Sequence, residues 1–172
     1  MPDSIRITAL NPANRDDFSC GNEALDRYIK QFAGQDIKRK IAVSYGAYKE
    51  KRLIGFYTLS AASIAAEELP EKLIKKLPKY PIPAILIGRL AIDISHQGKG
   101  LGSILLMDAI KRSIRGGELL GIFAILVDAK DEKAKSFYEH FGFTALEQNA
   151  LRLFLPVQTA LEVVSIEKTN GE

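Results

Sequence analysis

The sequence predicts a mixed α/β domain in which helices cover a central sheet. Short segments of strand character alternate with segments whose apolar residues repeat at helical spacing, and no linker interrupts this alternation. In addition, Ala84 to Ile92 and Ile122 to Val127 are almost continuously apolar. Such short apolar runs are typical of strands that are buried on both faces, at the centre of a helix-covered sheet.

The composition supports a single domain over residues 1–172. Of the 172 residues, 47% are hydrophobic and 26% charged, which excludes a disordered chain. Cys20 is the one cysteine, so a disulfide scaffold is excluded too. The longest apolar run, Leu119 to Val127, is roughly half of the about 18 residues that span a membrane. Because the N-terminus also lacks a signal-peptide layout, we expect a cytoplasmic protein with no membrane segment.

The first elements follow from turn residues and apolar spacing. A strand is predicted at Ile5 to Leu10, ended by the turn Asn11-Pro12. Asn22 is expected to cap a helix. The apolar stripe of that helix, with i, i+3, i+4, i+7 spacing, consists of Leu25, Tyr28, Ile29 and Phe32.

Two strands and a short helix come next. The strands, Ile41 to Tyr48 and Leu53 to Ser60, are joined by the charged turn Lys49 to Arg52. A helix is predicted over Glu71 to Leu77, because Pro70 is suited to a helix start and Pro78 stops it.

The second half continues the alternation. The buried strand Ala84 to Ile92 leads through a glycine-rich turn into a helix, which Gly116-Gly117 is expected to end. The buried strand Ile122 to Val127 precedes a helix from about Asp131 to His140. Between Thr144 and Val164 we expect two further strands, separated by Asn149-Ala150 and Pro156-Val157.

The net charge of +3 conceals two concentrations of cations. Between Gly34 and Arg52, six cations stand against two anions, and four later lysines with i, i+3, i+4, i+7 spacing are expected on one helical face. Two interpretations stay open: a solvated surface, helped at a helix end by the helix dipole, or a surface for a polyanion. The candidate residues are Lys38, Arg39 and Lys40 in the first group and Lys72, Lys75, Lys76 and Lys79 in the second.

The glycine-rich turn from Gln97 to Gly102 carries the most chemical information. Its three glycines let backbone amides approach an anion, and the helix start after it adds a positive dipole. Two known nucleotide loops do not fit this phosphate-binding pattern. Gly98-Lys99-Gly100 lacks the Ser or Thr of a P-loop, and Ser103 replaces the last glycine of the dinucleotide fingerprint.

A third pattern fits fully. Gln-x-x-Gly-x-Gly, from Gln97 to Gly102, resembles the acetyl-CoA pyrophosphate loop of the GNAT N-acetyltransferase superfamily. The segment Asp131 to Phe143 resembles the second signature of that superfamily, with Asp131 where many members have Asn. Further blocks in order, over roughly residues 5–157, are similar to the GNAT toxins of type II toxin–antitoxin pairs. They include Phe18 to Asn22, Gly55 to Ser60, Tyr80 to Pro83, Gly88 to Asp93, Val127 to Ala129 and Leu153 to Pro156.

This resemblance implies a GNAT acetyltransferase fold, with a central mixed, mostly antiparallel sheet covered by helices on both faces, and acetyl-CoA as co-substrate. Tyr138 matches the general acid of the family, and its phenol is protonated at neutral pH. Packing in the core beside Phe137 is the alternative role. The implied cofactor-binding residues are Leu90, Ala91, Ile92, Gln97, Gly98, Lys99, Gly100, Leu101, Gly102, Asp131, Ala134 and Phe137.

The toxin family acetylates the α-amino group of aminoacyl-tRNA and thereby blocks translation, and a ribbon-helix-helix antitoxin neutralises it. The resemblance therefore implies aminoacyl-tRNA as substrate, that antitoxin as partner, indirect association with DNA through it, and a homodimer. The two basic groups become candidates for tRNA binding. Arg89 is either a contact to the RNA end or a partner for a nearby acid, and these remain open.

The search for a general base and for metal ligands yields little. The strand Ala84 to Ile92 contains no Glu, and Asp93 lies at its end. An α-amine, with a pKa of about 7.7 to 8.0, is partly neutral at pH 7 and suits a site without a strong base better than a lysine does. His96 and His140 lack metal-ligand spacing, so no metal is expected.

The leading hypothesis is thus an acetyl-CoA-dependent toxin that acts on aminoacyl-tRNA. One alternative is an N-acetyltransferase of a small amine or a protein N-terminus. Another is a GNAT-fold subunit that acts mainly by forming a complex with a DNA-binding antitoxin. The basic groups favour tRNA over a small amine, and the glycine loop with Tyr138 argues against a purely structural subunit.

Overall fold

The computed structural model describes residues 4–11, 13 and 15–170. The strands follow the hydrogen-bonded order β1-β2-β3-β4-β5-β7-β6. Four of the neighbouring pairs are antiparallel, and β4 with β5 is parallel, so the predicted mixed, mostly antiparallel sheet is confirmed. Contacts group the chain into two compact units, residues 1–60 with 88–109 and residues 61–87 with 110–172.

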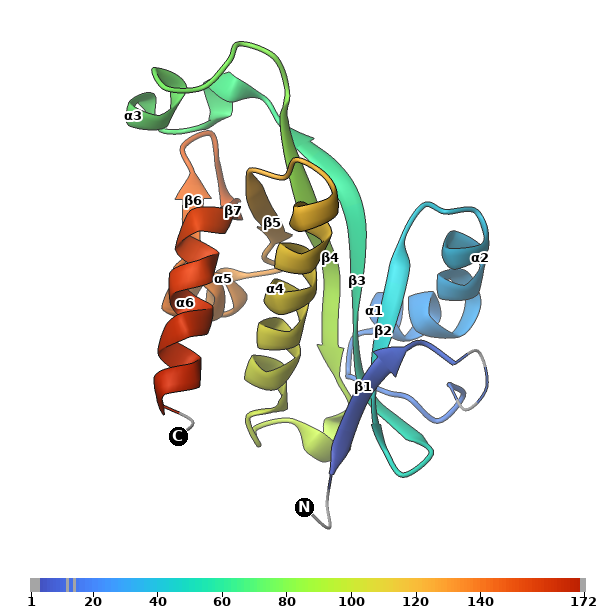
Figure 1. Ribbon diagram of the computed structural model, residues 1–172. Coiled ribbons are helices and arrows are strands. Elements are labelled where there is room, and N and C mark those ends of the chain that lie inside the picture. Colours follow the sequence, from blue (N-terminus) through green and yellow to red (C-terminus); the bar gives the residue numbers. More distant parts are fainter. Residues whose placement is uncertain (1–3, 12, 14, 171–172) are drawn as a thin grey trace. The chain divides into compact units, whose positions relative to one another are not determined.

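The first unit is built on an antiparallel meander. Strands β1 (Ile5–Ala9), β2 (Val43–Lys49) and β3 (Arg52–Ile64) pair in order, and the end of β4 (Ile82–Ile92) belongs to the same unit (Figure 1). Glu50 turns the β2–β3 hairpin with a φ of 57°. These strands match the predicted ones to within a few residues, except that β3 continues to Ile64.

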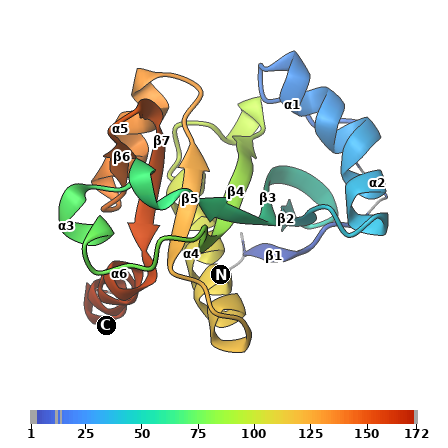
Figure 2. The ribbon, with the colours of Figure 1, turned by 90° about the horizontal axis from the view of Figure 1, so that it is seen from above.

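The predicted helix after Asn22 is confirmed, but its middle turn is wound differently. It consists of α1 (Glu23–Arg27), the π-helical turn η1 (Tyr28–Phe32) and α2 (Ala33–Lys38). The Asn22 side chain accepts hydrogen bonds from the backbone N–H groups of Ala24 and Leu25, as an N-cap should. Figure 2 shows this helical segment running beside β2 and β3 of the same unit.

Helical segments cover both faces of the sheet in the first unit. Two neighbouring residues of β3 show this, since successive strand residues face opposite sides of a sheet. Phe56 on β3 is fully buried, and its ring lies 5.4 Å from that of Phe18 and 6.4 Å from that of Tyr28 on η1. Its neighbour Gly55 faces the start of α4 (Leu101–Leu119), where it leaves room for Leu105.

The second unit holds the parallel pair and the C-terminal elements. Strand β5 (Ala124–Asp128) pairs with β4 over Ala84–Ile87 and with β7 (Asn149–Pro156), and β6 (Thr144–Leu146) lies at the edge. Helix α6 (Val157–Asn170) lies in front of β7 and α5 (Glu132–His140) behind it in Figure 1. Residues 124–127 are all buried, as their apolar run predicts.

Short helices complete the connections. A 3-10 turn, η2 (Ala66–Glu68), and α3 (Glu71–Ile74) lie between β3 and β4. A second 3-10 turn, η3 (Ile94–His96), follows β4 directly. Over the described ranges 4–11, 13 and 15–170, no helix has both the length and the apolar character needed to cross a membrane.

Three expectations about these elements are wrong. The helix that starts after Pro70 ends at Ile74, so Lys75, Lys76 and Lys79 lie beyond it and the four lysines do not share a helical face. Helix α4 does not end at Gly116-Gly117 but continues to Leu119, and both glycines lie in its last turns. Residues 157–164 form the start of α6 instead of a strand, and Asn149-Ala150 open β7.

Gly55 gives a test of the packing in the first unit. A methyl group there would lie 2.8 Å from Cδ1 of Leu105 and 3.2 Å from the carbonyl oxygen of Ala91. We therefore expect Gly55→Ala to lower the free energy of unfolding by about 1 to 3 kcal/mol through overpacking. Urea denaturation measures this, with Gly121→Ala as control because a methyl group at Gly121 meets nothing within 4 Å. Equal unfolding midpoints for the two variants would contradict the close packing.

Candidate active site

The glycine-rich turn has the geometry of an anion-binding loop. Residues 97–100 form turns between η3 and α4, and all four are exposed. Gly98 and Gly100 have φ angles of +75° and +85°, a region that side chains disfavour, although nothing lies within 4 Å of a methyl group at either position. Conformation, not space, therefore requires the two glycines. Leu101 and Gly102 begin the 19-residue helix α4, whose N-terminal N–H groups and dipole favour an anion.

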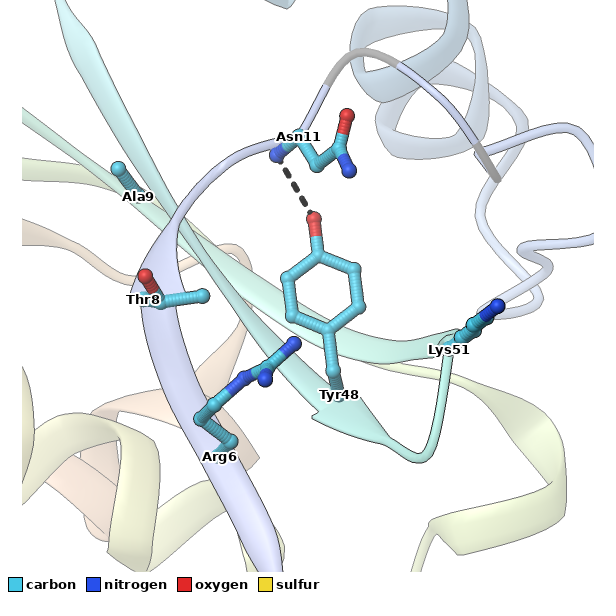
Figure 3. Close-up of a pocket in the computed structure, with 6 residues that line it drawn as sticks. All are labelled: Arg6, Thr8, Ala9, Asn11, Tyr48 and Lys51. Atoms are coloured by element: carbon cyan, nitrogen blue, oxygen red, sulfur yellow. Dashed lines mark hydrogen bonds between the residues drawn. The ribbon is translucent and has the colours of Figure 1, made fainter.

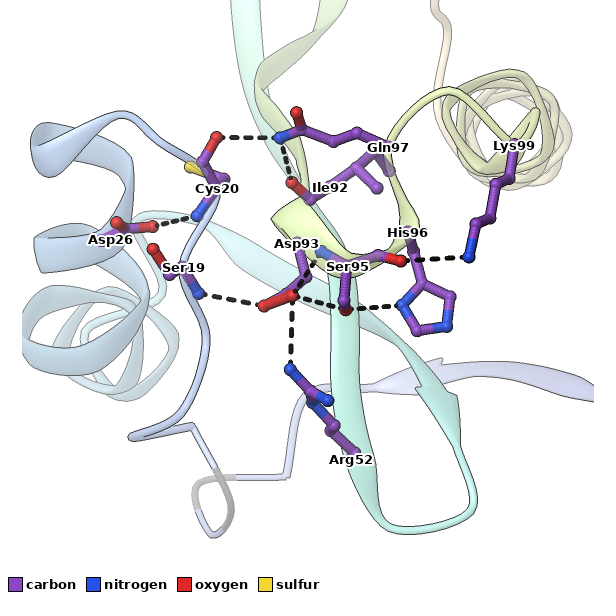
Figure 4. A network of polar contacts seen from close by, with 10 residues as sticks. All are labelled: Ser19, Cys20, Asp26, Arg52, Ile92, Asp93, Ser95, His96, Gln97 and Lys99. Atoms are coloured by element: carbon purple, nitrogen blue, oxygen red, sulfur yellow. Dashed lines mark hydrogen bonds and ion pairs between the residues drawn. The ribbon is translucent and has the colours of Figure 1, made fainter.

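The side chain of Gln97 braces this loop. Its Nε2 donates hydrogen bonds to the carbonyl oxygens of Cys20 and Ile92, each at 2.9 Å (Figure 4). The Nζ of Lys99 donates to the Ser95 carbonyl oxygen at 3.2 Å. In the chain alone, Gln97 thus holds the N-terminal segment and the end of β4 together, which leaves the backbone N–H groups and the exposed Lys99 ammonium as the loop's means of binding an anion.

Asp93, at the end of β4, organises the other side of the same loop (Figure 4). Its buried carboxylate accepts hydrogen bonds from the Ser95 hydroxyl at 2.7 Å and from the backbone N–H groups of Ser19 and Ser95 at 3.1 Å. Arg52 on β3 lies 3.4 Å away as an ion-pair partner. The Ser95 hydroxyl in turn lies 2.8 Å from Nδ1 of His96.

This network makes Asp93 a poor proton acceptor. Burial by itself would raise the pKa of Asp93, but the hydrogen bonds from Ser95 and Ser19 and the charge of Arg52 outweigh it and lower the pKa. His96 is a weak base as well, because burial and the cations Lys99 and Lys49 lower its pKa. Neither side chain fits the role of a strong general base.

The expected cofactor strand occupies the last residues of β4. The pairing of β4 with β5 runs from Ala84 to Ile87, so Leu90 to Ile92 lie beyond that paired segment. Ala91 is buried, whereas Leu90 and Ile92 are partly exposed. Backbone groups in this stretch therefore remain candidates for pairing with an extended ligand such as a pantetheine arm.

In the second unit, Asp131 and Ala134 share a helix cap. The Asp131 carboxylate accepts a hydrogen bond from the Ala134 N–H at 2.8 Å and so starts α5. An Asp caps a helix about as well as an Asn does. Phe137 and Tyr138 follow on the same helix, and Phe137 is partly exposed.

The ring of Tyr138 packs between aromatic side chains, and its hydroxyl keeps a proton that it can donate. Its ring lies 5.4 Å from that of Phe137 and 5.7 Å from that of Phe143, and the residue is 7% exposed. Burial, and then the negative charge of Asp128, raise the pKa of Tyr138 to about 12. Among the described residues, no group shares a hydrogen bond with its hydroxyl. The phenol therefore keeps its proton over the physiological range and has it free to donate.

Asp128, at the end of β5, is a residue near this site that the sequence did not single out. Its carboxylate accepts two hydrogen bonds from the Arg152 guanidinium, at 2.8 and 3.1 Å. The sequence signal that could have identified it is an exposed charged residue directly after four buried apolar residues, at the last position of β5.

The predicted tRNA-binding cations are exposed but do not form one group within a unit. Lys38, Arg39 and Lys40 lie at the end of α2 in the first unit. The second group lies on α3 and the turns after it, in the second unit, and consists of Lys72, Lys75, Lys76 and Lys79.

Arg89 has a partner that neither open alternative included. Its guanidinium lies 3.6 Å from the centre of the Tyr28 ring, a cation–π contact. The Tyr28 hydroxyl donates to Asp36 at 2.9 Å, and burial together with this bond raises the pKa of Tyr28 to about 12. Arg89 thus contacts the Tyr28 ring, and the Tyr28 hydroxyl contacts Asp36. All three residues line a cavity of about 450 Å³ in the first unit.

Within residues 4–11, 13 and 15–170, no three His, Cys, Asp or Glu side chains gather in a way that holds a metal ion.

Comparison with known proteins identifies the family. The family model of the acetyltransferase (GNAT) domain matches residues 40–145. A protein of Mycobacterium tuberculosis (strain ATCC 25618 / H37Rv) named tRNA-acetylating toxin is 35% identical over 86% of this chain and 88% of its own length.

Solved structures of other proteins also resemble this chain. AtaT in complex with acetyl-methionyl-tRNAfMet superimposes with a TM-score of 0.85 at 32% identity, over 93% of this chain and 99% of AtaT. A tyrosine-to-phenylalanine mutant of AtaT, bound to the C-terminus of the antitoxin AtaR and acetyl-CoA, gives 0.80 at 28% identity, over 94% and 98% of the chains. The KacTA–DNA complex gives 0.79 at 28%, over 94% and 99%. The chain belongs to the GNAT acetyltransferase family.

Proposed function

We propose that this chain is an acetyl-CoA-dependent N-acetyltransferase that acetylates the α-amino group of aminoacyl-tRNA and thereby inhibits translation as a toxin. The single observation that carries the proposal is its similarity, over most of its length, to AtaT, which was solved with an acetylated aminoacyl-tRNA. The free Tyr138 hydroxyl and the glycine-rich loop supply the parts that this reaction needs.

The chain's own residues have two tasks in this proposal. The backbone N–H groups from Gly98 to Gly102 and the start of α4 bind the pyrophosphate, which places the co-substrate. Acetyl-CoA supplies the activated acetyl group. As the new nitrogen–carbon bond forms and the carbon–sulfur bond breaks, the Tyr138 hydroxyl donates its proton to the leaving sulfur. The proton released from the amine goes to water, because Asp93 is held as a hydrogen-bonded anion with a lowered pKa.

The proposal extends to partners. We infer an antitoxin of the ribbon-helix-helix type that neutralises the toxin, a homodimer, indirect association with DNA through the antitoxin, and action in the cytoplasm, where charged tRNA occurs. Support comes from the antitoxin-bound AtaT and the KacTA–DNA complex. We also propose that the two units together make one acetyltransferase domain, since the family match from 40 to 145 includes residues of both.

One experiment tests the central claim. The purified protein is incubated with acetyl-CoA and a pool of charged tRNAs, and acetylated aminoacyl ends are identified by mass spectrometry. Acetylated aminoacyl-tRNA is expected. Activity on free amines or peptide N-termini without that product would instead favour an acetyltransferase of small amines or protein ends. No activity on any amine, together with tight antitoxin binding, would favour a subunit that acts by complex formation.

Tyr138→Phe is expected to lower kcat on charged tRNA by about 10²- to 10⁴-fold, because the proton donor to the leaving group is lost. The KM for acetyl-CoA should change little, since the ring and its packing remain. Single-turnover acetylation measures the chemical step. Tyr80→Phe serves as control, since Tyr80 is 64% exposed. A Tyr138→Phe enzyme with full activity would remove Tyr138 from the mechanism.

The pH profile of kcat/KM is expected to rise through the α-amine pKa of about 7.7 to 8.0 and then to stay level. The rise reflects the neutral amine that attacks. No fall should follow up to pH 9.5, because the pKa of Tyr138 is raised to about 12 and its proton is retained. Initial rates on charged tRNA between pH 6 and 9.5 measure this. A descending limb between pH 8 and 9.5 would show that the acid loses its proton earlier.

The paired reversal Lys75→Glu with Lys76→Glu tests the second basic group. Each lost phosphate contact lowers the dependence of log affinity on log salt by about 0.9. We expect tRNA binding at 0.1 M salt to weaken by about ten- to a hundredfold, measured by fluorescence anisotropy. Arg115→Glu, an exposed cation of α4 outside both groups, is the matched control. Unchanged affinity and salt slope would make these lysines a solvated surface.

A further inference from the structure

A second cavity in the first unit is lined by residues of β1, β2 and the turns next to them, and by no residue of the glycine-rich loop (Figure 3). Its volume is about 650 Å³, within the range of small-ligand sites, which is about 300 to 1,000 Å³. The roles proposed above use none of the residues that line it, which are Arg6, Thr8, Ala9, Asn11, Tyr48 and Lys51.

The side chains that line this cavity carry positive charge and no negative charge. Arg6 and Lys51 supply only hydrogen-bond donors, and the side chains of Thr8 and Asn11 can donate as well. Arg6 and Lys51 are exposed, and within the described part of the chain neither is ion-paired with a carboxylate. Lys51 also lines a neighbouring cavity that includes Asp16, Asp17 and Glu50, so Arg6 is the cation farther from acidic groups. A concave site with two cations attracts an oxyanion, and the planar guanidinium suits phosphate well.

Tyr48 adds a buried donor that points to the same ligand class. The residue is 4% exposed, and its hydroxyl oxygen accepts a hydrogen bond from the Asn11 N–H at 2.9 Å. That bond leaves the hydroxyl proton unused, and no described residue accepts it. Figure 3 shows the ring rising between Arg6 and Lys51, with the hydroxyl at the Asn11 end of the cavity. Because the hydroxyl lines the cavity, an oxyanion bound there can accept this proton.

We propose that this cavity binds a backbone phosphate of RNA, with Arg6 and Lys51 as charged ligands and the Tyr48 hydroxyl as a neutral donor. The assignment to the tRNA substrate rests on the proposed function. The lining offers donors without an acidic group to read a base or a cationic partner, as expected of a contact to the backbone. Lys51 also belongs to the cation-rich segment from Gly34 to Arg52, which extends the positive surface beyond the cavity.

Arg6→Ala in the full chain tests the proposal. Loss of one phosphate contact should weaken binding of uncharged tRNA about three- to tenfold at 0.1 M salt and reduce the salt slope by about 1. Fluorescence anisotropy at several salt concentrations measures both quantities. Arg115→Ala is the matched control and should leave both unchanged. Tyr48→Phe should weaken binding without changing the salt slope, since a neutral donor releases no counterion.

Two further probes identify the source of the anion. Inorganic phosphate should shift the backbone amide NMR signals of Thr8 and Asn11 in the natural protein and not in Arg6→Ala. Binding of an acidic peptide at this cavity without any effect of Arg6→Ala on tRNA would overturn the RNA assignment in favour of a protein partner. Unchanged tRNA affinity and salt slope in Arg6→Ala would overturn it as well.

The outcome is separable from that of the proposed function. Uncharged tRNA carries no aminoacyl α-amine, so its binding is measured independently of the proposed reaction. If the natural protein acetylates no charged tRNA while Arg6→Ala still weakens tRNA binding, the proposed reaction fails and the phosphate site stands. If acetylation occurs and Arg6→Ala binds tRNA normally, the phosphate site fails and the reaction stands.

Discussion

The buried carboxylate of Asp93 is the interaction on which the ordering of the glycine-rich loop depends. A carboxylate that is 3% exposed is costly unless donors and a cation compensate it. Here Ser19 from the N-terminal segment, Ser95 from the turn after β4, and Arg52 from β3 all converge on it. One charged group thereby fixes three segments that are distant in sequence, and the loop that follows starts from a defined position.

That arrangement also separates positioning from chemistry. The carboxylate oxygens of Asp93 accept hydrogen bonds, and the side-chain amide of Gln97 donates to the carbonyl oxygens of Cys20 and Ile92. What remains for ligands at the loop is the backbone, presented by glycines with positive φ, and the exposed Lys99 ammonium. In the proposed reaction, backbone N–H groups would bind the pyrophosphate without titrating or changing rotamer.

Burial sets the protonation state of Tyr138, the acid of the proposed reaction. Tyr138 packs against Phe137 and Phe143, so its position is set by the same aromatic contacts that stabilise α5 on the second unit. Burial beside Asp128 disfavours the phenolate and keeps the proton on the hydroxyl. Packing in the core and proton donation are therefore compatible roles for one residue. An α-amine acceptor completes this chemistry, since it needs no strong base.

The sequence by itself determined the α/β class, the positions of the two apolar strands, the Asn22 cap and the glycine loop, because apolar periodicity, caps and turn glycines are local properties. Burial on both faces is confirmed for β5 and wrong for β4, where only Ala84, Ile87 and Ala91 of the segment Ala84 to Ile92 are buried. The sequence also marked Tyr138 through the family resemblance. The tertiary structure alone decided what those side chains touch. Arg89 stacks on Tyr28, Gln97 braces the loop, and Arg6, Tyr48 and Lys51 share a cavity, although none is adjacent in sequence.

Local pattern failed where tertiary contacts or end effects outweighed it. Residues 157–164 form the start of α6, directly after Pro156, the last residue of β7. Lys75, Lys76 and Lys79 lie outside α3, which ends at Ile74, and Pro78 disfavours a helical conformation at the residue before it. Spacing along a chain fixes which residues share a face only if the helix forms, and which charges and hydroxyls meet depends on how distant strands pair.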